Sequence, residues 1–156
     1  YGGHPMAAGL SLDPANVEAF AQAFEAVVSR DLAVDDLQPQ LKIDGEIQLE
    51  EITDQFFAEI ELLEPFGQGN AEPVFISRNI QAVGVREVGR GHTRGTLLDQ
   101  HTGCSINFIA FDRTPESFPT SSWDAVYRAR LNTYNGVTSP QAQIIDVRGA
   151  GMGGSN

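Results

Sequence analysis

The first residues of the chain are the best candidates for chemistry. Gly2 and Gly3 stand side by side and His4 follows directly. Adjacent glycines let the backbone adopt conformations closed to other residues and approach a ligand closely, and backbone N–H groups in such a turn can point together at an anion. His4 can donate a proton to that anion or accept one from it. The stretch predicts a phosphate-binding loop. The alternative is a plain glycine turn with a surface histidine, because short glycine motifs often match by chance.

The remaining reactive side chains predict neither a metal site nor a nucleophile. Cys104 is the single cysteine, so no intrachain disulfide can form, which fits a reducing, cytoplasmic setting. It stands in an alternating apolar run and is expected in the core. His4, His92 and His101 are scattered among turn residues, and no spacing typical of metal ligands occurs. We therefore expect no metal site in this chain.

Charge divides the chain into two different halves. The net charge is −11, which by itself argues against a nucleic-acid partner. Residues 1–76 carry 2 basic and 15 acidic side chains, a net charge of −13. Residues 77–156 carry 8 basic and 6 acidic side chains, a net charge of +2, and every one of these cations is arginine. Only the second half is a plausible binder of a phosphate backbone, and arginine suits phosphate and base stacking better than lysine does.

The first half predicts helices. Asp13 as N-cap and Pro14 at the first helical position begin a helix that runs to about Arg30. Its apolar residues recur at helical spacing, which predicts a buried face; they are Val17, Phe20, Ala21, Phe24, Val27 and Val28.

A short strand is expected over residues 41–44, with a turn at Gly45. The helix that follows has an apolar side and ends before Pro65. Its other side is acidic, at Glu50, Glu51, Asp54, Glu59, Glu61 and Glu64. We interpret these charges as a solvated face, and the alternative is a surface that docks a protein.

The pattern changes from helical to alternating after the turn-rich stretch of residues 65–75. Five strands are predicted, with residues 132–140 as a loop; they are Ile80 to Val88, Arg94 to Asp99, Cys104 to Phe111, Asp124 to Leu131 and Gln141 to Arg148. Five short strands with an insertion between the third and the fourth match the Greek-key barrel called the OB-fold.

Such barrels bind single strands on the face of their second and third strands and with two loops. The residues that we predict to bind nucleic acid there are Arg90, Arg94, Arg128, Arg130, Asn132 and Tyr134. Arginines for phosphate and an aromatic ring for base stacking are the required ingredients. The alternative is a structural barrel whose polar residues only face water.

Three motifs carry a family resemblance. Gly2 to Gly9 resembles the signature of the DHHA1 domain in DHH-family phosphoesterases. Pro65 to Phe75 resembles the junction of the RecJ family of bacterial single-strand-specific exonucleases, with Ala71 where that family usually has proline. Leu131 to Gly136, followed by Gln141, is similar to the last hairpin of that family.

The resemblance implies an α+β chain made of the C-terminal part of a DHHA1 α/β domain and a five-stranded OB-fold barrel. The parts would be residues 1–64 (DHHA1), 65–75 (junction), 76–149 (barrel) and 150–156 (a flexible tail). The chain starts without methionine, so we expect a fragment that lacks the catalytic DHH domain.

The resemblance also implies an activity. The parent enzyme would remove nucleotides 5′ to 3′ from single-stranded DNA in repair and recombination, using Mn²⁺ or Mg²⁺ held by the missing domain. Gly2, Gly3 and His4 would contact the substrate phosphate, and this chain alone would be inactive. Single-stranded DNA is the expected partner, together with single-strand-binding protein or other repair proteins, and no membrane. The alternatives are a stand-alone OB-fold module that binds single strands or proteins, or part of a phosphodiesterase acting on nanoRNA or cyclic dinucleotides.

Overall fold

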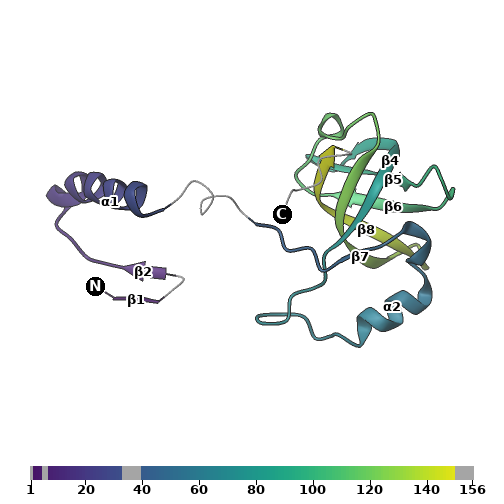
Figure 1. Cartoon of the computed structure of the whole chain (residues 1–156), viewed down its shortest axis with the longest axis horizontal. Helices are drawn as coiled ribbons and strands as arrows, with labels where there is room; N and C mark the ends of the chain where they lie inside the picture. The colour runs from purple at the N-terminus through teal and green to yellow at the C-terminus, as the bar shows by residue number, and fades with distance from the viewer. Residues whose placement is uncertain (1, 5–6, 33–39, 150–156) are drawn as a thin grey trace. The chain divides into compact units, whose positions relative to one another are not determined.

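The computed structural model describes residues 2–4, 7–32 and 40–149 and divides the chain into two compact units, Tyr1–Leu41 and Lys42–Asn156. Figure 1 labels the elements of both units, and each unit is described by itself. The expected tail at residues 150–156 lies outside the described residues. None of the helices in the described part combines the length and the apolar character needed to cross a membrane.

The first unit is a small hairpin and one helix. Strand β1 (Gly2–His4) pairs antiparallel with β2 (Ala7–Gly9). A 3-10 turn, η1 (Pro14–Asn16), leads into α1 (Val17–Asp31). Asp13 caps this entry, because its Oδ1 accepts a hydrogen bond of 2.8 Å from the backbone N–H of Ala15. The predicted helix start is confirmed, one 3-10 turn before the α-helix.

The apolar face of α1 is exposed within this unit, contrary to the expectation of a buried face. No residue of α1 is buried. Phe20 and Phe24 stack on each other with ring centroids 5.7 Å apart, yet they remain 40% and 58% exposed. The physical reason is the size of the unit: a two-stranded hairpin and one helix provide no second layer that could cover the face.

The second unit contains a closed barrel of five strands. They are β4 (Phe75–Val88), β5 (His92–Leu98), β6 (Ser105–Ala110), β7 (Trp123–Tyr134) and β8 (Val137–Gly149). They follow the order β4-β5-β6-β8-β7, and the pairing of β4 with β7 closes the barrel. Only the β6–β8 pair within the barrel is parallel. The α+β class and the five-stranded OB-fold predicted from the sequence are confirmed.

Side chains from all five strands fill the barrel. The largest fully buried side chains are Trp123, Tyr127 and Phe108. The Tyr127 hydroxyl and the Ser77 hydroxyl share a hydrogen bond of 2.7 Å, and burial raises the pKa of Tyr127 to about 12. Gly95 is required by close packing, because a Cβ there would lie 2.7 Å from the ring of Phe108. Buried and more exposed residues alternate along β6, whereas Trp123 to Tyr127 at the start of β7 are all buried.

The segment before the barrel belongs to the same unit. It comprises β3 (Gly45–Glu46), η3 (Leu49–Glu51) and α2 (Asp54–Glu61). Gly45 was expected in a turn, but it lies in β3, which runs parallel to β4 with Gly45 opposite Phe75. Leu49, Ile52 and Phe57 join the core cluster of the barrel. The compact unit that contains the barrel therefore begins at Lys42, because these apolar side chains need the barrel to bury them.

The last two strands form one long hairpin where the sequence predicted a loop at residues 132–140. β7 continues to Tyr134 and β8 begins at Val137. The turn consists of Asn135 and Gly136 alone, with φ values of 50° and 78°. Positive φ at both central residues is the type I′ geometry that Asn-Gly favours, and its twist matches that of the strands. The Asn-Gly pair was the signal that the loop assignment overlooked.

Candidate nucleic-acid interface

The outward side chains of β5, β6, β8 and β7 form rows across the barrel, because the strand register places them opposite one another. Arg94 lies opposite Ile109, and Asn107 lies opposite Gln141. Gln141 in turn lies opposite Arg130 across β7 and β8. A polar row thus crosses several strands on one face, which is the arrangement needed to contact an extended polymer.

A shallow groove of about 350 Å³ lies on this face. Arg94, Asn132 and Tyr134, three of the six residues predicted to bind nucleic acid, line it together with Val88, Asn107, Ile109, Val137, Ser139 and Gln141. Tyr134 is 72% exposed, so its ring is free to stack on a base. The groove combines a cation, amide groups and an aromatic ring within one concave surface.

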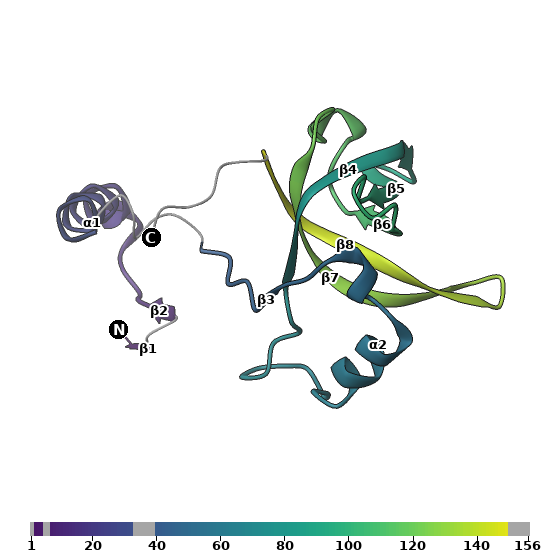
Figure 2. The ribbon, with the colours of Figure 1, turned by 45° about the vertical axis from the view of Figure 1, so that its right-hand side comes forward.

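The β7–β8 hairpin forms one wall of the groove. Asn132 lies opposite Ser139 and Tyr134 lies opposite Val137. Figure 2 shows this hairpin reaching beyond the strands β5 and β6. The structure therefore holds Asn132 and Tyr134 on a paired strand, where the sequence analysis expected Asn132 and Tyr134 in a loop.

Two arginines face each other at the edge of the groove. Arg86 on β4 is the register partner of Arg94 on β5, and both side chains are exposed. Neither forms an ion pair with any described residue. Like charges directly opposite each other destabilise a sheet, and an anion between them would offset the repulsion. Sequence reasoning missed Arg86 because a bulge between Val83 and Arg86 sets this register.

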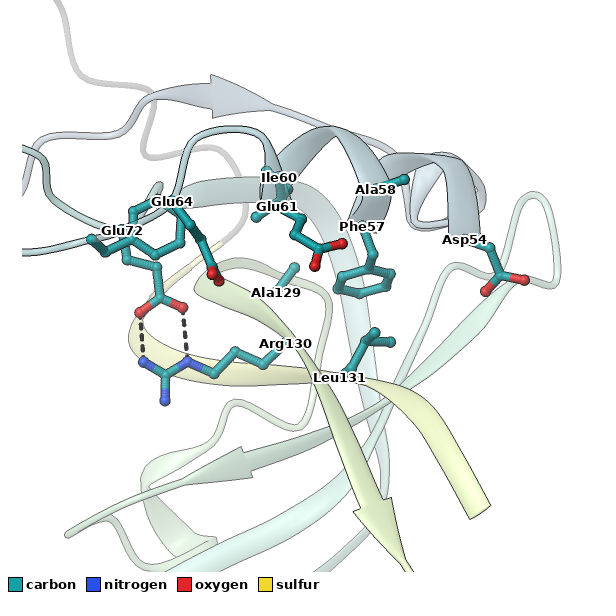
Figure 3. A pocket seen from close by; sticks show the side chains of 11 residues that line it. Asp54, Phe57, Ala58, Ile60, Glu61, Glu64, Glu72, Ala129, Arg130 and Leu131 are labelled. Carbon is teal, nitrogen blue, oxygen red and sulfur yellow. Dashed lines mark hydrogen bonds and ion pairs between the residues drawn. The ribbon is translucent and has the colours of Figure 1, made fainter. Parts of the chain in front are cut away.

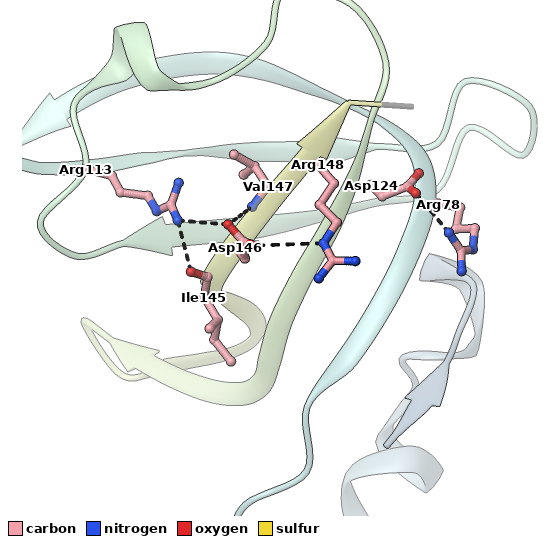
Figure 4. Close-up of polar contacts among 7 residues, drawn as sticks. All are labelled: Arg78, Arg113, Asp124, Ile145, Asp146, Val147 and Arg148. Carbon is pink, nitrogen blue, oxygen red and sulfur yellow. Dashed lines mark hydrogen bonds and ion pairs between the residues drawn. The ribbon is translucent and has the colours of Figure 1, made fainter. Parts of the chain in front are cut away.

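The other barrel arginines that the sequence left unassigned are paired with carboxylates (Figure 4). Arg78 bonds Glu46 and Asp124 at 2.8 and 3.0 Å. Arg113 donates to Asp146 at 3.2 Å, and Arg148 lies 3.8 Å from the same carboxylate. Arg113 and Arg148 are therefore both paired with Asp146, and neither of them lines the groove.

Arg90 lies in the turn between β4 and β5. Gly89 and Gly91 flank it with φ values of 62° and 74°, and the arginine is exposed without lining the groove. His92 follows it, and its Nδ1 accepts a hydrogen bond of 3.1 Å from the backbone N–H of Asp112. The imidazole also packs edge-on against Phe111, with centroids 5.2 Å apart. Arg90 is thus placed for a contact at the rim, whereas His92 is held against the barrel.

Arg128 and Arg130, the remaining predicted contacts, are paired with Glu72. Arg130 Nε donates to Glu72 Oε1 at 2.8 Å and its Nη2 donates to Oε2, while Arg128 Nε lies 3.6 Å from Oε2. The hydrogen bond from Arg130 holds the pKa of Glu72 below its usual range. Neither arginine lines the groove; Arg130 is hydrogen-bonded to Glu72, whereas Arg128 Nε is buried beside the same carboxylate without a hydrogen bond.

The glycine-histidine stretch is extended and not a turn. Gly2, Gly3 and His4 form β1, and Gly3 lies opposite Ala8 of β2. A Cβ on Gly3 would lie 3.2 Å from the Ala8 Cβ, so the glycine serves close strand packing. Successive N–H groups of a strand point to opposite edges and do not converge on one anion. The predicted cradle is therefore not formed, the phosphate contact stays a prediction, and the His4 side chain lies outside the described residues.

No cluster of three or more His, Cys, Asp or Glu side chains that could hold a metal ion occurs within residues 2–4, 7–32 and 40–149.

The chain matches the family model for the RecJ OB domain over residues 43–146. Among curated proteins, it is 38% identical over 154 residues to the single-stranded-DNA-specific exonuclease RecJ of Thermus thermophilus, covering 95% of this chain and 21% of that protein. It is 27% identical over 149 residues to RecJ of Bacillus subtilis, covering 94% of this chain and 19% of that protein. The chain spans about a fifth of the length of these relatives.

The solved structures agree with this match. The crystal structure of Thermus thermophilus RecJ in complex with Mn²⁺ superposes with a TM-score of 0.72 at 25% identity, covering 88% of this chain and 20% of that one. The same protein is also known in complex with Mg²⁺.

Proposed function

The chain belongs to the RecJ OB domain family, and from this premise we propose that its barrel binds single-stranded DNA as the substrate-binding part of a 5′-to-3′ exonuclease acting in repair and recombination. The observation that carries this proposal is the groove that brings Arg94, Asn132 and Tyr134 together on the outer face of the barrel. A flat aromatic ring beside a cation suits a strand whose bases are unpaired.

In this proposal each kind of side chain in the groove makes a different contact with the DNA strand. The ring of Tyr134 stacks on a base, and Arg94 with its neighbour Arg86 contacts the adjacent phosphate. The amides of Asn107 and Asn132 donate to and accept from base edges or sugars. Stacking tolerates any base, so this set of contacts favours single strands without a strong sequence preference.

Charge limits the affinity of this chain for DNA. The second half of the sequence carries only +2, and two of its arginines are already paired with Glu72. Binding by two or three arginines would give a shallow salt dependence, since each neutralised phosphate of a single strand adds about 0.7 to the slope of log K against log salt. We expect weak, salt-sensitive binding by the chain alone and tighter binding in the full-length enzyme.

The chemistry of the full-length enzyme is assigned to its other domains. In this proposal, the residues before the barrel include the end of a DHHA1 domain, and Gly2, Gly3 and His4 contact the phosphate beside the catalytic centre. Mn²⁺ or Mg²⁺ would activate water there and stabilise the leaving oxygen, and the described residues supply no ligand cluster for it. The chain alone is then expected to bind DNA without cleaving it.

Fluorescence anisotropy with a labelled oligo-dT strand tests the binding role. Tyr134→Ala and Arg94→Ala should each weaken binding at low salt by about five- to tenfold, as expected for one stacking or one charge-assisted contact. Arg148→Ala is the matched control, because it removes an exposed arginine that does not line the groove. Equal losses in Arg94→Ala and Arg148→Ala would reduce the arginine effect to net charge, and no loss in Tyr134→Ala and Arg94→Ala would refute the groove.

A nuclease assay of the same chain with Mn²⁺ tests the catalytic assignment separately. Hydrolysis of single-stranded DNA by the purified 156-residue chain would contradict it, whatever the binding assay shows.

A further inference from the structure

A second depression, of about 700 Å³, lies between α2 and β7 (Figure 3). Its floor is apolar: Phe57 and Ile60 come from α2, Phe66 from the turn-rich segment and Leu131 from β7. Phe57 is 9% exposed, whereas Leu131 is 51% exposed and presents its side chain to the opening. We call this depression the α2–β7 cleft. An open apolar floor of this kind can receive a bulky apolar side chain.

The wall of the α2–β7 cleft is acidic. Asp54, Glu61 and Glu64 all line it, and all three are exposed. None of the three forms an ion pair with a described residue. Arg130 is the only cation among the described lining residues, and Glu72 already neutralises it. The cleft therefore carries uncompensated negative charge around an apolar floor, which repels nucleic acid and attracts cations.

Two exposed leucines stand next to cleft-lining residues in the sequence. Leu62 and Leu63 directly follow α2 and are 83% and 50% exposed. Neither leucine lines the cleft, but both stand between the lining residues Glu61 and Glu64 in the sequence, and like Leu131 both are exposed to water. Clustered exposed apolar side chains rimmed by charge are typical of protein interaction sites.

We propose that the α2–β7 cleft docks a short basic protein segment that carries one bulky apolar side chain. The apolar side chain enters between Phe57 and Leu131, and lysine or arginine residues on either side of it meet Glu61 and Glu64. Charge complementarity selects this occupant, because an acidic segment or a nucleic acid would face three unpaired carboxylates. The DNA groove is lined by other residues, so both sites can be filled at once.

A designed peptide tests this proposal with the whole 156-residue chain. The probe is an amidated 12-residue peptide of alternating lysine and alanine with a central phenylalanine. Its two twins replace either the phenylalanine by serine or every lysine by glutamate. In ¹⁵N–¹H spectra of the labelled protein, the probe should shift amides of α2 and of β7 around Leu131. Both twins should bind at least about fivefold more weakly, since one buried side chain or one set of ion pairs is lost.

Protein variants locate the site. Glu61→Gln combined with Glu64→Gln should weaken the probe about fivefold and flatten its salt dependence, and Leu131→Ser should weaken it similarly. The matched control is Glu50→Gln combined with Glu59→Gln, which removes two exposed carboxylates that do not line the cleft and should leave the affinity within about twofold.

Several results would overturn the proposal. They are equal weakening in the control, equal binding of the serine twin, or shifts that avoid α2 and β7. Self-association of the chain that Leu131→Ser abolishes would assign the cleft to a second copy instead. If Leu131→Ser fails to fold, the serine twin of the peptide still tests the apolar contact on the unaltered protein.

Discussion

Glu72 and Arg130 stand 58 residues apart in the sequence and are joined by a two-point ion pair, in which both carboxylate oxygens accept from one guanidinium. Glu72 lies in the turn-rich segment and its side chain is 19% exposed, whereas Arg130 lies on β7 directly opposite Gln141, which lines the groove of the barrel. The pair ties the entry of the barrel to its longest hairpin. It also occupies two arginines, because Arg128 lies 3.6 Å from the same carboxylate.

Replacing this carboxylate should strengthen DNA binding. Glu72→Gln keeps the shape of the side chain but removes the charge that neutralises Arg130 and Arg128, so both guanidinium groups become available to phosphate. We expect tighter binding of oligo-dT and a slope of log K against log salt that is steeper by about 0.7 to 1.4. Anisotropy titrations between low and moderate salt measure both quantities.

The control for this variant is Glu116→Gln, which removes an exposed carboxylate from a different part of the barrel. A gain of the same size in the control would show that net charge alone is responsible. Weaker binding in Glu72→Gln would mean that the carboxylate orients the arginines toward DNA, which would contradict the prediction.

The same pair predicts how stability depends on pH. Arg130 holds the folded-state pKa of Glu72 below its usual range, near 4.3 in unfolded chains. A depressed pKa stabilises the fold above the unfolded value, and this contribution is lost as the pH falls through the folded value. The difference in unfolding free energy between the unaltered protein and Glu72→Gln should therefore be constant near neutral pH and shrink below about pH 4. Urea unfolding at pH 7, 5, 4 and 3 measures it, and a difference that grows toward low pH would contradict the assignment.

Alternation of apolar residues was enough to predict the strands of the barrel. The residues that contact its arginines could not be predicted from local sequence. Arg94 and Tyr134 could be placed at the groove because each stands on a strand or hairpin of a fold with a known binding face. Arg130 was expected on the same surface, but its partner comes from residue 72, and no local pattern reports a contact over that separation. Arg86 was missed for a similar reason, since a one-residue shift at a bulge decides which side chain it faces.

Gly95 tests the packing that sets the outward face. A Cβ at this position would lie 2.7 Å from the Phe108 ring and 3.1 Å from the Val83 carbonyl oxygen. Gly95→Ala should thus lower the unfolding free energy by about 1–3 kcal/mol through overpacking. Gly67→Ala is the control, because a Cβ there meets no atom within 4 Å. Urea denaturation of both variants measures the difference, and equal stabilities would show that Phe108 can move aside.

The facing arginines predict opposite effects on stability and on binding. Arg86 and Arg94 are register partners without a carboxylate partner in the described part of the chain, so each repels the other in the free protein. Arg86→Gln should raise the unfolding free energy at low salt by about 0.2–0.5 kcal/mol, because the like-charge pair is removed. It should at the same time weaken oligo-dT binding, because a phosphate that lies between the two guanidinium groups loses one of them. Arg90→Gln is the matched control, since it removes an exposed arginine from the adjacent turn and should leave stability unchanged. Thermal unfolding and anisotropy on the same samples give both readouts, and a variant that loses stability and affinity together would show that Arg86 supports the barrel and does not serve DNA.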